Sequence, residues 1–127
     1  MPQDFKESPA WKLSYDFVKD IYSVSQSFPK EERYAFTSQI RRASMSIPLN
    51  LAEGHGRRPG KDFLSFVYNA LGSAKEVECC LMLARDFKYI TQFQFAELNE
   101  KLDHIGRTLT LLRKSTESDI SNKENNK

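Results

Sequence analysis

Apolar side chains recur at helical spacing in four segments of the chain, and the first segment runs from residue 9 to residue 28. Ser8 is a suitable N-cap, and Pro9 suits the first position of a helix. Two adjacent apolar rows follow, Ala10, Ser14, Phe17, Ile21, Val24 and Phe28 in one and Trp11, Tyr15, Val18 and Tyr22 in the other. The predicted helix therefore has an apolar face that is wider than a single partner helix needs.

The second predicted helix spans residues 30–54, with acidic residues in its first turn, where they suit the helix dipole. Its apolar stripe begins at Phe36 and continues through Ile40, Ala43 and Ile47. Pro48 lies inside this pattern and removes one backbone hydrogen bond, so we expect a kink there rather than an end. Glycine is a common helix terminator, and the helix is expected to end at residue 54.

The third and fourth predicted helices span residues 62–89 and 92–115. Apolar residues alternate at spacings of four and three in both, from Phe63 to Ala84 and from Phe95 to Leu112. Gly72 interrupts the third helix and suggests that another backbone comes close there. After the fourth helix, residues 117–127 show no apolar periodicity and are predicted to form a disordered polar tail.

No segment shows the alternation of a β-strand, and the predicted connections between helices are short. Short connections make successive helices antiparallel neighbours. We therefore predict an all-α fold, an antiparallel up-down-up-down four-helix bundle over residues 9–116, preceded by an N-terminal arm at 1–8 and followed by the tail.

Composition agrees with one globular domain. The chain has 127 residues, 39% of them apolar and 28% charged, and no apolar run is long enough for a membrane span. Cys79 and Cys80 are adjacent, so they cannot easily form a bridge, and two reduced cysteines favour a cytoplasmic location. The net charge is only +2, but residues 41–62 carry five basic against two acidic side chains, so positive charge is local.

The stretch NLAEGHGRRPGKDF, residues 50–63, resembles a phosphate-binding P-loop at first sight. A P-loop needs four residues between its glycines and a hydroxyl after its lysine, whereas here the spacings are five and three and Asp62 follows Lys61. As a connection into a helix, it presents cations beside free backbone amides, an arrangement that suits nucleic-acid phosphates. The candidate anion-binding residues are Arg41, Arg42, Arg57, Arg58 and Lys61, and a simply solvated loop is the alternative.

A polar row flanks the apolar stripe of the second helix. It consists of Gln39, Ser46, Asn50 and Glu53. Polar groups that are partly buried need partners, so the row predicts a structural network that fixes helix register or joins subunits. A small-molecule or anion site is the alternative.

Enzyme and metal sites are not expected. Di-metal bundles use Glu-x-x-His motifs on two helices, but Glu100 precedes His104 by four residues and no second copy exists. No nucleophile and base pair stands out, and the cysteines lack an obvious activating base. We therefore expect no catalytic residues, no metal and no cofactor.

Several stretches together identify a resemblance: IYSVSQSFPKEERY, SQIRRASMSIPLNLAEGHGR, FLSFVYNALGSAKEVE and DFKYI. They resemble the 23S rRNA intervening-sequence protein family, also called S23 ribosomal proteins or four-helix bundle proteins, over roughly residues 11–113. Residues 38–57 are the most specific part, and Pro48 and the polar tail depart from the family pattern.

The resemblance implies a homo-oligomer, with a pentamer expected, and genetic contexts linked to RNA. Some members are encoded within insertions in 23S rRNA genes, and a related branch serves as the accessory protein of diversity-generating retroelements. No catalytic residues come with the family. We therefore expect a non-catalytic, oligomeric protein that associates with RNA or DNA, or alternatively a protein-interaction scaffold that does not bind nucleic acid itself.

Overall fold

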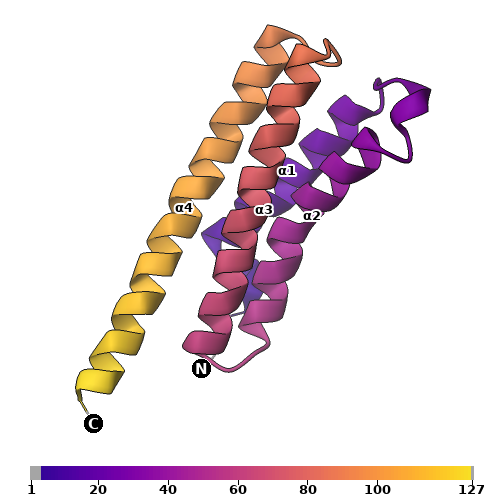
Figure 1. The fold of residues 1–127 in the computed structure, drawn as a ribbon. Coiled ribbons are helices and arrows are strands. Elements are labelled where there is room, and N and C mark those ends of the chain that lie inside the picture. Colours follow the sequence, from indigo (N-terminus) through magenta and orange to yellow (C-terminus); the bar gives the residue numbers. More distant parts are fainter. Residues whose placement is uncertain (1–3, 127) are drawn as a thin grey trace.

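The computed structural model describes residues 4–126 and contains four long helices joined by short connections (Figure 1). They are α1 (Pro9–Ser25), α2 (Phe36–His55), α3 (Lys61–Asp86) and α4 (Gln92–Asn125), with two short 3-10 helices, η1 (Phe5–Glu7) and η2 (Lys30–Glu32). Successive helices run in opposite directions, and α1 and α3 each pack against both α2 and α4. No strand occurs between residues 4 and 126. The predicted all-α, antiparallel four-helix bundle is confirmed.

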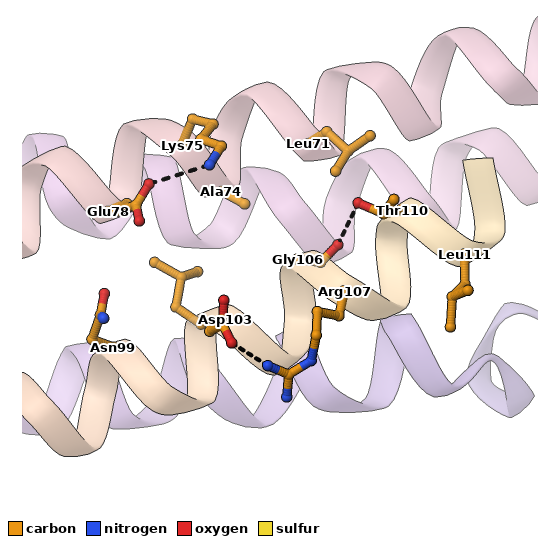
Figure 2. A pocket seen from close by; sticks show the side chains of 11 residues that line it. Leu71, Ala74, Lys75, Glu78, Asn99, Asp103, Gly106, Arg107, Thr110 and Leu111 are labelled. Atoms are coloured by element: carbon orange, nitrogen blue, oxygen red, sulfur yellow. Dashed lines mark hydrogen bonds and ion pairs between the residues drawn. The ribbon is translucent and has the colours of Figure 1, made fainter. Parts of the chain in front are cut away.

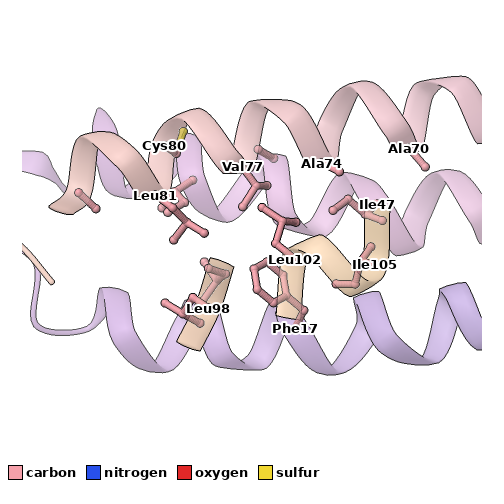
Figure 3. Packing of buried hydrophobic residues seen from close by; sticks show 14 of the residues in the cluster. Phe17, Ile47, Ala70, Ala74, Val77, Cys80, Leu81, Leu98, Leu102 and Ile105 are labelled. Atoms are coloured by element: carbon pink, nitrogen blue, oxygen red, sulfur yellow. The ribbon is translucent and has the colours of Figure 1, made fainter. Parts of the chain in front are cut away.

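The apolar stripes of all four helices meet in one core (Figure 3). Fully buried side chains come from every helix and include Phe17, Ile21, Ile40, Ile47, Leu51, Val67, Val77, Leu81, Ile105 and Leu109. All of these positions except Leu51 are those that the helical spacing predicted, because a stripe at 3.6-residue period is the part of each helix that burial stabilises.

Side chains cap the starts of α1 and α4, and the cap of α1 is the predicted one. The Ser8 hydroxyl accepts a hydrogen bond from the Trp11 backbone N–H at 3.5 Å, and Pro9 occupies the first turn of α1. Thr91 and Gln94 form a reciprocal capping box at the start of α4. Within the predicted arm, η1 places Phe5 edge-on against Trp11 with ring centroids 5.1 Å apart, and residues 1–3 lie outside the described residues.

The second helix begins six residues later than predicted. Residues 30–32 form η2 instead, and Ala35 adopts φ −124° and ψ −100°, which breaks the helix before Phe36. The physical reason is that residues 30–35 have no apolar face to bury, and Tyr34 is 88% exposed. Beyond this start, α2 continues through Pro48 as expected and ends at His55.

The predicted ends of the first and third helices were each three residues too late. Phe28 precedes Pro29, and a residue before proline disfavours the helical conformation, so α1 ends at Ser25. After α3, Lys88 adopts a left-handed conformation with φ 65°, and the Tyr89 N–H returns to the Ala84 carbonyl at 2.8 Å. This turn closes the helix at Asp86.

The prediction of a disordered tail is wrong for residues 117–125, because α4 continues as a helix to Asn125; residue 127 of the predicted tail lies outside the described residues. The last turns of α4 are polar, but several of their side chains contact the rest of the bundle. Thr116 is buried, Ile120 is half-buried, and Glu117 accepts hydrogen bonds from Tyr68 and Arg113. Packing against the start of α3 therefore supports a segment whose own composition favours disorder.

Gly72 was expected to mark a close approach of backbones. Within the described part of the chain, nothing lies within 4 Å of a Cβ placed at Gly72, so that expectation is wrong for the bundle's own helices. Among residues 4–126, no helix combines the length and the apolar character needed to cross a bilayer.

Candidate nucleic-acid interface

The connection between α2 and α3 is built on glycines. A Cβ at Gly54 would lie 2.8 Å from Cβ of Phe66, so the two helices approach more closely there than an alanine permits. Gly60 has φ 92°, a conformation that side chains disfavour, and it directly precedes α3. No side chain caps this helix start, so its first backbone N–H groups remain available to an anion.

Three of the predicted cations lie on this connection, and each has an acidic neighbour. The Arg57 guanidinium is 2.9 Å from Glu53, and that of Arg58 is 3.7 Å from Asp62. The Lys61 ammonium is 3.4 Å from a Glu124 carboxylate oxygen. The three cationic side chains are 55%, 91% and 79% exposed, respectively. Exposed ion pairs of this kind contribute about 0–1 kcal/mol, so phosphate oxygens can replace the carboxylates at little cost.

The other two predicted cations lie elsewhere, so the five do not form one patch. The Arg41 Nε donates to the Ser25 hydroxyl at 2.8 Å, and its guanidinium lies 4.5 Å from the centroid of the Tyr22 ring. Arg41 therefore ties α2 to α1. Arg42 is exposed and forms no ion pair with any residue between 4 and 126. Its position, 13 residues before the end of α2, is about 20 Å from the connection.

The predicted polar row divides into three parts. Ser46 and Ser73 share a hydrogen bond of 2.7 Å between α2 and α3, and the Asn50 amide donates to the Ser46 hydroxyl at 2.9 Å. Gln39 donates to Glu76 at an exposed position farther along the same pair of helices. Glu53 faces Arg57 instead of the network. The bonds of Gln39 and Ser46 match a role in holding the register between α2 and α3.

His55 ends α2 at the edge of the connection. Its ring packs against Phe63 with centroids 4.9 Å apart, and its Nε2 atom is buried without a partner among the described residues. Burial lowers the pKa of His55, and the negative charge of Asp4 opposes this only in part. The side chain is therefore neutral at physiological pH and adds no charge to the connection.

The described residues were also compared with what a metal site or a reactive cysteine needs. No group of three or more His, Cys, Asp or Glu side chains is placed to hold a metal ion within residues 4–126. Cys79 is exposed, whereas burial raises the pKa of the Cys80 thiol to about 11, so Cys80 stays protonated near neutral pH.

A groove of about 450 Å³ runs between α3 and α4 on another part of the surface (Figure 2). Its two walls carry self-contained ion pairs, Lys75 with Glu78 and Arg107 with Asp103. These pairs resemble those of the connection in exposure, but they lie along the sides of helices and away from any helix start.

The comparison with protein families concerns nearly the whole bundle. The model of the family described as 23S rRNA-intervening sequence protein matches residues 6–111. The chain belongs to this family. No curated protein matches the chain.

A solved structure supports the membership. It is a protein of unknown function from the S23 ribosomal protein family of Bacteroides thetaiotaomicron, with 26% sequence identity and a TM-score of 0.77, and the match covers 83% of this chain and 98% of that one. In this member of the 23S rRNA-intervening sequence protein family, the α2–α3 connection thus lies inside the family match, whereas residues 112–125 of α4 lie beyond it.

Sequence reasoning missed the contribution of the end of α4 to the connection. Glu117 and Glu124 contact residues near the start of α3, and Ile120 lies beside Gly60. A weak signal was present, because Thr116 and Ile120 extend the stripe of Leu112 at four-residue spacing.

Proposed function

We propose that this chain is a non-catalytic, oligomeric accessory protein of the cytoplasm that associates with RNA through its α2–α3 connection. The observation that carries the proposal is the set of three exposed cations, Arg57, Arg58 and Lys61, gathered next to the uncapped start of α3. Flexible cations beside free backbone amides suit phosphate groups, which carry the largest share of non-specific affinity for nucleic acids. The family description, which refers to 23S rRNA, supports RNA as the ligand.

Self-association is the second part of the proposal. The second apolar row of α1 remains half-covered, and Tyr15 is 45% exposed. With Trp11 from the same row and Leu49 of α2, which is 64% exposed, it lines an apolar groove of about 460 Å³. A second copy of the chain would cover this face, and the resemblance implies that five copies assemble.

The RNA part is tested by fluorescence anisotropy with a mixed-sequence, single-stranded RNA of 20 nucleotides at several salt concentrations. Substituting both Arg57→Ala and Arg58→Ala should weaken binding and lower the slope of log affinity against log salt by about 1.4, because each lost phosphate contact on a single strand accounts for about 0.7. The matched control, Lys75→Ala with Arg107→Ala, removes two paired and exposed cations from the α3–α4 groove and should leave the slope nearly unchanged.

Equal effects of the two double variants would contradict the assignment to the connection. Absence of RNA binding by the unmodified protein would remove the RNA function and favour the protein-interaction scaffold. The oligomer is tested separately by light scattering on Leu49→Lys, which should reduce the assembly, because a charge in the apolar groove would be desolvated.

A further inference from the structure

The last turns of α4 dock onto the α2–α3 connection. Ile120 Cγ1 lies 3.9 Å from the position that a Cβ of Gly60 would occupy, and Glu124 pairs with Lys61 at 3.4 Å. About two turns farther into α3, the Tyr68 hydroxyl donates to Glu117 at 2.6 Å. Three contacts thus hold residues 117–125, which we call the C-terminal strap, against the start of α3.

The strap and the connection carry opposite charge. The strap, residues 117–125, contains three carboxylates and one lysine, for a net charge of −2, whereas residues 57–62 contain three cations and one carboxylate, for a net charge of +2. The two surfaces face each other across a groove of about 500 Å³ that both of them line. The negative potential of the strap therefore falls on the cations proposed to bind RNA.

The strap lies against the α2–α3 connection without close packing. Within the strap, Glu117 and Ile120 are half-buried and the other residues are exposed. The polar contacts of the strap with α3 are one exposed ion pair and one exposed hydrogen bond, and Ile120 lies beside Gly60. Such contacts contribute little individually, so displacing the strap requires far less free energy than unfolding the bundle.

We propose that the C-terminal strap is a built-in competitor for the RNA-binding surface. In the docked state, the Glu124 carboxylate occupies a binding position of Lys61, and Glu117 with Asp119 adds repulsion toward incoming phosphates. An RNA strand binds more tightly once the strap is displaced or its charge removed. This inference rests on the proposed RNA-binding function, and it concerns a segment beyond the family match at residues 6–111.

The charge test uses the full chain with Glu117→Gln and Glu124→Gln together. These changes keep helix length and side-chain shape but remove two negative charges, so the affinity for the same single-stranded RNA should rise about fivefold at low salt and converge with the unmodified protein at high salt. The matched control, Glu78→Gln with Asp103→Asn, makes the same change in net charge on the α3–α4 groove and should raise affinity by less than about twofold.

Docking is tested without RNA by hydrogen exchange. Ile120→Ala removes the apolar contact but favours helix, so exchange of the amides at residues 117–125 should become about threefold faster or more, while Ile120→Leu should behave as the unmodified chain. Ile120→Ala should also bind RNA more tightly. Exchange that is equally fast in all three proteins would show that the strap is not docked and would overturn the inference.

The two possible failures are distinct. If the unmodified protein binds RNA but the strap variants bind no more tightly than the groove control, the competition is wrong and the RNA function stands. If neither the unmodified protein nor any variant binds RNA, both the RNA function and the competition are wrong. The hydrogen-exchange experiment still shows whether the strap docks.

Discussion

The two ends of the bundle are held together by different forces (Figure 1). One end holds the α1–α2 and α3–α4 connections. There, four aromatic rings lie with neighbouring centroids 5.4–5.9 Å apart: Phe28, Phe87 and Tyr89 of the connections and Phe36 at the start of α2. At the other end, the α2–α3 connection meets the last turns of α4 through charged and exposed side chains. Dissolved ions do not displace packed aromatic rings. In an exposed ion pair, by contrast, another anion readily replaces the carboxylate.

A polar contact strengthens the aromatic end further. The Tyr89 hydroxyl donates to Glu32 at 2.8 Å, which joins η2 to the connection after α3 and raises the pKa of Tyr89 through that hydrogen bond. The comparison suggests a division of roles, in which the aromatic end fixes the bundle and the charged end is free to bind a ligand.

The largest expected effect is at the aromatic end. Phe28→Ala should lower the free energy of unfolding by about 3 kcal/mol, because Phe28 is only 7% exposed and packs against the rings of Phe36 and Tyr89. Urea unfolding measures this effect. Ile120→Ala at the charged end should cost less than about 1 kcal/mol, because Ile120 is only half-buried. Comparable losses would contradict the difference between the ends.

A second substitution tests the one tightly packed position at the charged end. Gly54→Ala gains up to about 1 kcal/mol of helix propensity, but the new methyl group would meet Phe66 at 2.8 Å and push α2 from α3, which typically costs about 1–3 kcal/mol. We expect a net loss of about 1 kcal/mol in thermal or urea unfolding. An unchanged or higher stability would show that α3 moves away freely.

Acidification should lower the free energy of unfolding through His55, which lies at the charged end. Burial holds the pKa of His55 below its usual 6.5 in the folded protein, so the unfolded chain binds a proton first as pH falls. His55 therefore leaves the free energy of unfolding unchanged above about pH 7. This free energy, measured by urea unfolding, declines as pH falls through 6.5 toward the pKa of His55 in the folded protein. His55→Gln should flatten this part of the profile of unfolding free energy against pH. A profile unchanged by His55→Gln would assign the decline to other groups.

The bundle could be predicted from the sequence because the pattern that specifies each helix is local and periodic. Phe36, Ile47 and Leu109 lie on stripes whose period alone identifies a buried helix face. The end of α4 could not be predicted in this way, because Ile120 and Glu124 are stabilised by residues about 60 positions earlier in the chain. Composition describes such a segment in isolation, and only tertiary contact makes it a helix.

The candidate site shows the same limit. The glycines and cations of the α2–α3 connection were visible in the sequence, since turns and charge are local properties. Their partners were not, because the pairing of Lys61 with Glu124 depends on how α4 crosses the start of α3. Arg41 was grouped with the other cations by proximity in sequence, although the structure directs it toward Tyr22 of α1.

The smallest expected effect is at Gly72, midway between the two ends, and it has the opposite sign to that at Gly54. Gly72 lies inside α3 with nothing within 4 Å of an added Cβ among the described residues, so Gly72→Ala should stabilise the isolated protomer by about 0.5 kcal/mol through helix propensity alone. Unfolding is measured at a protein concentration low enough for the chain to be monomeric. Light scattering on the same variant then tests whether copies meet at this glycine. An assembly that persists places the subunit contact elsewhere, as at the apolar groove beside Leu49, whereas a variant that is more stable as a protomer but no longer assembles would place a neighbouring backbone against α3 at Gly72.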